Sequence, residues 1–471
     1  MITAEEYYRE GPVQRRLAEF CGGIPENTDT FLCKHLASYG VRNLGANGKP
    51  HQAHHNHEFH QILANGLDIF RSSWSRNASF FFLDVEYFNL DYKGEIYLHA
   101  HEELKRLEPV YRLIRSVLDS YGLEYITTLT GQGYHFVSLI PESDPEHRIL
   151  EEIGKVEDTL AGKYNAGNNF LNERVELSKG RAYEGIGRLL EFVFQRIVSE
   201  ASGHTDLPIV MSDLAVGRGK NGHEGISIDL TMYGDPINKR SFRIPFSTHQ
   251  KHKVQRYLVS ESISAGTPVQ ISLPRLTYRN GDRIEMDLET LLQARRHFRR
   301  SAELAGGIST QIPFIGRGLE RLISDYRSSP LFQFHREFDE VEHDSPEVWH
   351  RTYDQFPGTE KLPPCIGIPV SQPKPELLKP TNIQTLVRYM IRKGWHPKHI
   401  AGWLRSRYER DYGWGDIWHK LDAATKANFW VRVYAGLIKT GADQMVDFNC
   451  VSHQEKKYCP QPWCGFNLAE I

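Results

Sequence analysis

Along the first 300 residues, the spacing of hydrophobic positions predicts alternating strands and helices. The segment 78–88 (ASFFFLDVEYF) is rich in aromatic and branched side chains, which favours a buried strand. Apolar residues at helical spacing over 101–122, closed by a glycine, predict a helix. Two further strand-like runs, 124–130 and 134–140, lie on either side of the glycine turn GQG.

The whole chain divides into three regions. Further helical segments precede the strand-like run EGISIDL, so residues 1–300 predict an α+β (mixed α/β) domain with an antiparallel or mixed sheet. Glycine, serine and proline interrupt short helical pieces over 301–360, which predicts a linker or a small bridging subdomain. A proline-rich entry, helical periodicity and an irregular cysteine-containing tail predict a helical, metal-binding domain over 361–471.

Composition and charge restrict the classes of protein. The 471 residues contain 57 Lys and Arg against 59 Asp and Glu, which excludes holding nucleic acid by bulk positive charge; any polyanion must meet local basic patches. The first twenty residues carry acids and arginines, so no signal peptide is expected, and no run of eighteen apolar residues predicts a membrane span. We therefore expect a cytoplasmic protein with no membrane partner.

Two acids interrupt the most hydrophobic strand segment. Because residues two apart on a strand share a face, Asp84 and Glu86 point the same way. Such acids repel one another and tolerate burial best beside Mg²⁺ or Mn²⁺, which prefer oxygen ligands. Asp229 offers a third carboxylate from a separate strand. On adjacent strands the three could hold two divalent ions for nucleotidyl transfer; a solvent-facing acidic edge is the alternative for the pair.

Two other segments contain candidate phosphate-binding residues. In the turn Gly131, Gln132, Gly133, the missing side chains let a backbone approach an anion closely, and His135 follows; alone, it is more typical of a packed structural histidine. In RIPFSTHQKHK, alternate positions of an extended segment share one face and could receive a triphosphate; a basic surface strand is the alternative. These positions are Arg243, Ser247, His249 and Lys251.

In this order, four motifs resemble those of the archaeo-eukaryotic primase superfamily: FFLDVEY, TGQGYHF, SIDL and Arg-x-Pro-x-Ser-x-His-x-Lys. The resemblance covers roughly residues 75–260 and implies a primase-type catalytic domain. It implies that Asp84, Glu86 and Asp229 bind the catalytic metals and that His135 contacts the phosphates of the incoming nucleotide. The four basic and hydroxyl residues of RIPFSTHQK are implied in the same pocket.

The chain departs from the family pattern at three positions. Thr130 and Gln132 stand where many replicative small subunits carry serine and arginine. Glu86 replaces a frequent second aspartate, as it does in the primase-polymerase branch. These departures leave open the role of Gln132 and the preference between ribo- and deoxynucleotides.

The C-terminal region resembles the iron-sulfur domain of the primase large subunit. The sequence Pro-Pro-Cys-Ile, a helical segment and three late cysteines carry this resemblance. It implies a [4Fe-4S] cluster, which needs four thiolates. These would be Cys365, Cys450, Cys459 and Cys464. The competing set is a local Zn²⁺ site that takes His453 in place of Cys365; free thiols in a structural tail are a further alternative.

Basic and aromatic residues add candidate nucleic-acid contacts. Trp395, Trp403 and Trp414 lie among arginines and lysines, which suits base stacking and phosphate contact; core tryptophans on an amphipathic surface are the alternative. A second group precedes the linker and either touches template phosphates or forms an exposed helix face. It comprises Arg295, Arg296, Arg299 and Arg300.

Together these features predict a DNA primase or primase-polymerase that makes primers on single-stranded DNA from NTPs, dNTPs or both. A nucleoid-associated location and a helicase or polymerase partner are compatible with that activity. Two other classes are considered: a non-catalytic nucleic-acid-binding or assembly protein with this fold, and a metal-dependent nuclease. The presence of all three acids together with the nucleotide-pocket residues argues against the first, and a nuclease would not need a triphosphate-binding segment.

Overall fold

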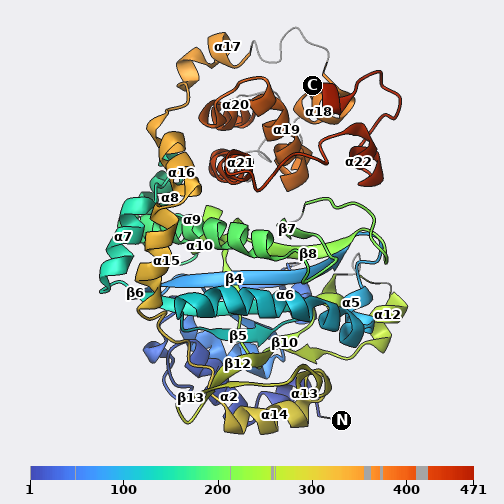
Figure 1. Ribbon diagram of the computed structural model, residues 1–471. Helices are drawn as coiled ribbons and strands as arrows, with labels where there is room; N and C mark the ends of the chain where they lie inside the picture. The colour runs from blue at the N-terminus through green and yellow to red at the C-terminus, as the bar shows by residue number, and fades with distance from the viewer. Residues whose placement is uncertain are drawn as a thin grey trace.

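The computed structural model describes residues 2–47, 49–212, 214–255, 259, 261–354, 362–371, 375–409 and 423–471. It confirms the predicted α+β class: its sheets are mostly antiparallel and its C-terminal region is helical (Figure 1). Within these ranges, none of the helices combines the length and the apolar character needed to cross a membrane.

The central sheet has seven strands in the order β13-β12-β5-β6-β4-β8-β7. β4 lies between β6 and β8 and pairs antiparallel with both, whereas β7 runs parallel to β8. Strand β4 is therefore fixed by hydrogen bonds on both edges. The strands are β4 (Ala78–Asn89), β5 (Ile126–Leu129), β6 (Gly133–Pro141), β7 (Ile209–Met211), β8 (Glu224–Asp229), β12 (Leu273–Arg279) and β13 (Asp282–Glu285).

Two long helices, α6 (Ala100–Tyr121) and α9 (Leu177–Glu200), pack against each other and against β4. α6 buries the apolar stripe that the sequence predicts, including Leu104, Leu107 and Ile114, and stops at Gly122, whose φ of 74° suits glycine.

A second sheet of four strands, in the order β2-β1-β3-β9, covers the central sheet near β4. The ring of Phe242 on β9 lies 4.0 Å from that of Phe82 on β4. Because Phe82 is two residues from Asp84, this sheet covers the face that carries the predicted acids. The strands are β1 (Leu36–Tyr39), β2 (His51–His54), β3 (Asp68–Ser72) and β9 (Ser241–Arg243), with a separate pair β10 (Thr248–His249) and β11 (Gln270–Ile271).

Shorter helices surround the two sheets. They are α1 (Ala4–Tyr7), α2 (Gly11–Phe20), α3 (Val41–Asn47), α4 (Phe59–Ala64), α5 (Glu95–Leu98), α7 (Pro145–Ile153), α8 (Asp158–Ala166), α10 (Pro236–Lys239), α11 (Lys251–Val254), α12 (Glu261–Gly266), α13 (Leu288–Ala294) and α14 (Phe298–Gly307).

Between α14 and the C-terminal helices, the chain forms the helices α15 and α16. α15 packs against α6 and α9, and α16 packs against α21 of the C-terminal region, so two ordered helices connect the layers (Figure 1). The helices from here onward are α15 (Gly318–Arg327), α16 (Pro330–Glu340), α17 (Trp349–Thr352), α18 (Pro364–Ser371), α19 (Pro380–Arg392), α20 (Pro397–Glu409), α21 (Ala423–Lys439) and α22 (Cys450–Glu455).

Buried ionisable side chains connect the C-terminal region to helix α9. Glu191 on α9 accepts from Arg432 on α21 at 2.5 Å and lies 3.1 Å from His335 on α16. All three side chains are nearly fully buried. Charges removed from water in this way require their partners, so the network fixes how the three helices meet.

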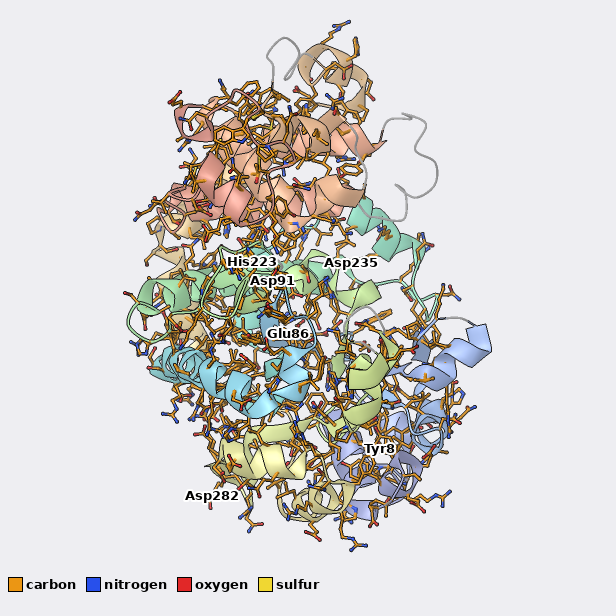
Figure 2. All side chains as sticks on the ribbon, turned by 90° about the vertical axis from the view of Figure 1, so that its right-hand side faces the viewer. Tyr8, Glu86, Asp91, His223, Asp235 and Asp282 are labelled. Carbon is orange, nitrogen blue, oxygen red and sulfur yellow. The ribbon has the colours of Figure 1, made fainter. Side chains whose placement is uncertain are left out.

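A second set of contacts joins the C-terminal tail to the end of β4. His223 lies 2.6 Å from Asp91, and Lys457 of the tail pairs with the same carboxylate at 2.7 Å. The backbone N–H of Arg218 donates to Glu455. Figure 2 shows Asp91 and His223 between Glu86 and the C-terminal helices. The tail that contains three of the cysteines is therefore docked beside the strand that carries Asp84 and Glu86.

The buried network predicts a large loss of stability when one member is removed. Arg432→Ala leaves Glu191 without its guanidinium partner and should lower the free energy of unfolding by about 3–5 kcal/mol, measured by chemical denaturation. The matched control is Arg336→Ala, whose partner Glu340 is exposed; it should cost less than about 1 kcal/mol. Equal losses in the two variants would contradict a structural role for the buried network.

Candidate functional site

The sheet register brings the three predicted acids onto one face. Asp84 on β4 stands directly opposite Asp229 on β8, and directly opposite His135 on β6. Glu86 is two residues further along the same face of β4. Residues that are distant in the chain therefore converge at the middle of the central sheet.

The acids crowd one another electrostatically. One carboxylate oxygen of Asp84, Oδ1, is buried and accepts no hydrogen bond from the described residues. Burial, then the charges of Glu86 and Asp229, raise the pKa of Asp84 well above its usual value, against the opposing charges of Lys251 and Arg240. A buried acid with an unused oxygen and two acidic neighbours fits a cation, which would replace the proton that Asp84 otherwise retains.

Local hydrogen bonds hold Asp229 in place. Its Oδ1 accepts from the Ser212 hydroxyl at 2.9 Å and from the Thr231 backbone N–H at 2.8 Å. Its Oδ2 accepts from the Thr231 hydroxyl. These bonds orient the carboxylate at the end of β8, just before the chain turns toward β9.

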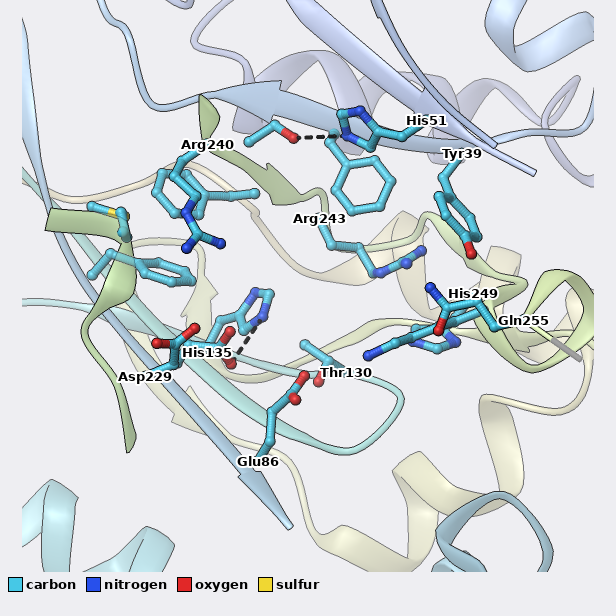
Figure 3. Close-up of a pocket in the computed structure, with 17 residues that line it drawn as sticks. Tyr39, His51, Glu86, Thr130, His135, Asp229, Arg240, Arg243, His249 and Gln255 are labelled. Atoms are coloured by element: carbon cyan, nitrogen blue, oxygen red, sulfur yellow. Dashed lines mark hydrogen bonds and ion pairs between the residues drawn. The ribbon is translucent and has the colours of Figure 1, made fainter. Parts of the chain in front are cut away.

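A cavity of about 270 Å³ opens between the two sheets above these acids. Figure 3 shows Asp229 and Glu86 on one side and Arg240, Arg243 and His51 on the other. The cavity thus has an acidic wall from the central sheet and a basic wall from the second sheet. Its lining includes Tyr39, Phe82, Asp84, Thr130, His135, His249, Lys251 and Gln255 as well.

The glycines of the turn are required by close contacts. A Cβ on Gly133 would lie 1.8 Å from the Val85 carbonyl oxygen, so no larger residue fits beside β4. A Cβ on Gly131 would lie 2.2 Å from Nε2 of His249. The turn therefore lets His249 pack directly onto the backbone beneath it. These contacts, and not an anion alone, explain why both glycines stand here.

His135 projects from β6 into the cavity, with Nε2 3.5 Å from Oδ1 of Asp84. Burial, then the positive charge of Arg243, lower the pKa of His135 to about 3. The imidazole is therefore neutral at pH 7 and retains one N–H and one acceptor nitrogen.

The basic segment does not form the single extended run that the sequence predicts. Arg243 ends β9, Phe246 has a φ of 68°, and Thr248 begins β10 on a different sheet. Ser247 is fully buried and accepts from the Ile69 backbone N–H, so its hydroxyl supports β3 and does not line the cavity. The positive-φ turn breaks the alternation on which the prediction was based.

The other basic residues of the segment do reach the cavity, and protein hydrogen-bond partners hold two of them. Arg243 donates to the buried Asp68 at 2.8 Å. Lys251 donates to Oε1 of Gln132 at 3.0 Å, which places the predicted Gln132 behind the lysine, outside the cavity lining. Burial, then Arg243, lower the pKa of His249 well below its usual value, so this ring is also neutral.

Sequence reasoning missed several lining residues. Arg240 faces Asp229 across the cavity and donates to the Thr231 hydroxyl. His51 lies on β2, and its ring lies 3.4 Å from the Ser241 hydroxyl at the cavity wall. Both positions depend on the pairing of β9 with the second sheet, which no local motif reveals.

The four predicted cysteines gather in the C-terminal region. The pKa of Cys365 is raised to about 12, and burial is the largest cause. The charges of Cys459, Cys450 and Cys464 raise it as well, with smaller effects in that order. The Sγ of Cys450 accepts from the Leu468 backbone N–H at 3.4 Å. Throughout the described ranges, however, no three histidine, cysteine, aspartate or glutamate side chains stand in ligand geometry around one point. This holds for the cysteines and for Asp84, Glu86 and Asp229 alike, so either metal site would require its side chains to turn toward the ion.

His453, the alternative zinc ligand, is engaged elsewhere. Its Nδ1 lies 3.0 Å from the Asn449 carbonyl oxygen and its Nε2 lies 3.4 Å from the Thr385 hydroxyl. The ring is buried against these partners. Both ring nitrogens therefore already have protein partners.

Two predicted stacking residues lie in or against the core. Trp403 is fully buried, and Trp395 packs against the hydrophobic core. Trp414 lies outside the described residues. By contrast, Trp463, which lies between Cys459 and Cys464 in the sequence, is 98% exposed. Helical periodicity does not distinguish a core tryptophan from a binding one, and of the two alternatives that the sequence leaves open, the structure favours the core for Trp395 and Trp403.

The raised pKa of Asp84 gives a test of cation binding. The folded state holds the proton of Asp84 more tightly than the unfolded chain does. The protonated carboxyl therefore favours the folded state fully below pH 3.8, and this contribution to stability is lost as pH rises through the raised pKa. At pH 7 Asp84→Asn should therefore raise the Tm of the metal-free protein by about 2–4 °C. Excess Mn²⁺ should raise the Tm of the wild type and not that of the variant.

The control for this experiment is Asp282→Asn, an exposed aspartate on strand β13 of the same sheet. It should leave both the metal-free Tm and the response to Mn²⁺ unchanged. A lower Tm in Asp84→Asn, together with a wild type that does not respond to Mn²⁺, would refute the cation site.

Comparisons with known proteins give little further guidance. No protein-family model matches the chain, and no curated protein matches it. Among solved structures, the polymerase domain from Mycobacterium tuberculosis ligase D in complex with DNA matches with a TM-score of 0.34 and 9% identity, over 69% of this chain and 93% of that one. A likeness this weak establishes neither the family of this chain nor its function.

Proposed function

We propose that the chain is a template-dependent nucleotidyltransferase, a primase or primase-polymerase that starts and extends primers on single-stranded DNA with Mg²⁺ or Mn²⁺. The observation that carries this proposal is the cavity between the two sheets. It places three convergent acids, Asp84, Glu86 and Asp229, across from a wall of basic side chains. An acidic cation site beside a basic wall matches the two charged parts of a metal-bound nucleoside triphosphate.

The reaction joins the 3′ hydroxyl oxygen of one nucleotide to the α-phosphorus of the next and breaks the bond to the β-phosphate, so pyrophosphate leaves. Cations held by the three acids would activate that hydroxyl and neutralise charge on the leaving group. The chain itself positions the substrate: Arg240, Arg243 and Lys251 line the cavity and would face the phosphates.

Two neutral histidines line the cavity and suit contact with phosphate oxygens. His135 lies beside Asp84 and would donate its N–H to a phosphate oxygen without adding a charge next to the cations. His249 rests on Gly131 and would present its ring edge to the same group. Hydrogen bonds, and not general acid–base transfer, are the contribution expected from both rings.

The four cysteines support a second proposal, that the C-terminal region holds a [4Fe-4S] cluster. The raised pKa of Cys365, to which Cys459, Cys450 and Cys464 contribute, supports this proposal, because four neighbouring thiolates are the ligands that a [4Fe-4S] cluster needs. The engagement of both His453 nitrogens favours the four-cysteine set over the zinc set. Because Lys457 pairs with Asp91 at the end of β4, an ordered tail would also support the catalytic strand.

Primer synthesis tests the first proposal. The full chain, incubated with circular single-stranded DNA, Mn²⁺ or Mg²⁺ and labelled nucleotides, should give short new products. Asp84→Ala and Asp229→Ala should each reduce the product by at least about a thousandfold, because each removes a cation ligand. The exposed control Asp282→Ala should retain wild-type activity. Cleavage of the DNA would instead indicate a nuclease, and neither product nor cleavage a binding protein.

Metal analysis tests the second proposal. Protein purified without oxygen should contain iron and absorb broadly in the visible range. Cys365→Ser should lose both signals, whereas His453→Ala should keep them. The buried cysteine Cys33, far from the cluster in sequence, provides the control variant Cys33→Ser. Zinc without iron, retained in Cys365→Ser and lost in His453→Ala, would instead identify the local zinc site.

A further inference from the structure

Arg295 is a buried cation behind the proposed nucleotide pocket. The sequence groups it with Arg296, Arg299 and Arg300 as a basic surface, but the structure separates them: Arg295 is 0% exposed, and the other three are exposed. It caps the C-terminal end of α13, and its guanidinium points inward to the turn between β5 and β6.

This guanidinium has no compensating negative charge. Its Nη2 donates to the Thr130 carbonyl at 2.7 Å and to Oε1 of Gln270 at 2.5 Å. Its Nε and Nη1 are buried without a hydrogen-bond partner, and no described carboxylate forms an ion pair with it. Burial lowers its pKa to about 10, so it still carries its charge at pH 7. Such a charge is costly to the folded state.

Arg295 contacts two segments that support the pocket wall, the turn after β5 and strand β11. Thr130, which accepts from the guanidinium, precedes Gly131, on which the His249 ring rests. His249 is paired across β10 and β11 with Gln270, the second acceptor. The Ile271 backbone N–H also donates to the Arg295 carbonyl. One side chain thus ties the glycine turn to the strand pair that carries His249.

We propose that Arg295 is a positioning residue for the polyphosphate of the bound nucleotide. It holds the Thr130–Gly131 turn and His249 at a fixed separation, and its uncompensated charge lies behind the wall that a triphosphate would face. This inference rests on the proposed function and extends it to a residue that does not line the cavity. A charge in this place favours ligands in proportion to their own negative charge.

The test is nucleotide binding by the full chain, measured by titration calorimetry with a non-hydrolysable nucleoside triphosphate and with the matching monophosphate in the presence of Mg²⁺. Arg295→Met should weaken the triphosphate about tenfold and the monophosphate clearly less, because the removed charge acts on ligand charge. Arg295→Lys, which keeps the charge, should recover most of the triphosphate affinity. In primer synthesis the KM for nucleotide should rise more than kcat falls.

Arg71→Met is the matched control. Arg71 is equally buried, and it donates to the Phe20 carbonyl and the Ser75 hydroxyl away from the cavity lining. It should leave both affinities unchanged. If Arg295→Met does not fold, Arg295→Gln, which keeps a donor for the Thr130 carbonyl, takes its place with the same expectation.

The outcomes separate the two proposals. A wild type that binds triphosphate and an Arg295→Met that binds it equally well would overturn the role of Arg295 alone. Equal losses for both ligands, or equal losses in the Arg71 and Arg295 variants, would reduce it to a structural residue and also overturn the proposal. A wild type that binds no nucleoside triphosphate would overturn the proposed function, and this inference with it.

Discussion

The structure depends on the register by which β4 pairs with its two neighbours. A shift of one residue would turn Asp84 to the opposite face from Asp229 and would remove His135 from both. The register is constrained at Gly133, because the Val85 carbonyl oxygen lies so close to its backbone that no side chain would fit there. The cost of this arrangement is a cluster of acids whose mutual repulsion the protein alone does not relieve.

The two sheets contribute side chains of opposite charge to the cavity. The central sheet supplies the acids, and the second sheet and the segment after it supply Arg240, Arg243 and Lys251. Because several of these cations already have protein partners, such as Asp68 for Arg243 and Gln132 for Lys251, they are held in place before any ligand enters. Arg295 differs from these cations, because neutral acceptors hold it in place and do not neutralise its charge. Its positive charge can therefore still attract an anion in the pocket.

The sequence predicts this site well where the functional residues lie close together in the chain. The i, i+2 spacing of Asp84 and Glu86 on an apolar strand, and the turn that precedes His135, both predict positions that the structure brings together. Longer-range features were harder to predict. The positive φ of Phe246 removes Ser247 from the cavity, and the burial of Arg295 and Trp403 depends on packing between distant elements, which periodicity does not contain.

The central claim is that Asp84, Glu86 and Asp229 share cations beside a nucleoside triphosphate. The most direct measurement is a crystal of the full chain grown with Mn²⁺ and a non-hydrolysable nucleoside triphosphate, with manganese located by its anomalous scattering. The account predicts manganese peaks between these three carboxylates, with the triphosphate against Arg240, Arg243 and Lys251. Manganese bound elsewhere, with these carboxylates free of metal while the nucleotide is present, would contradict it.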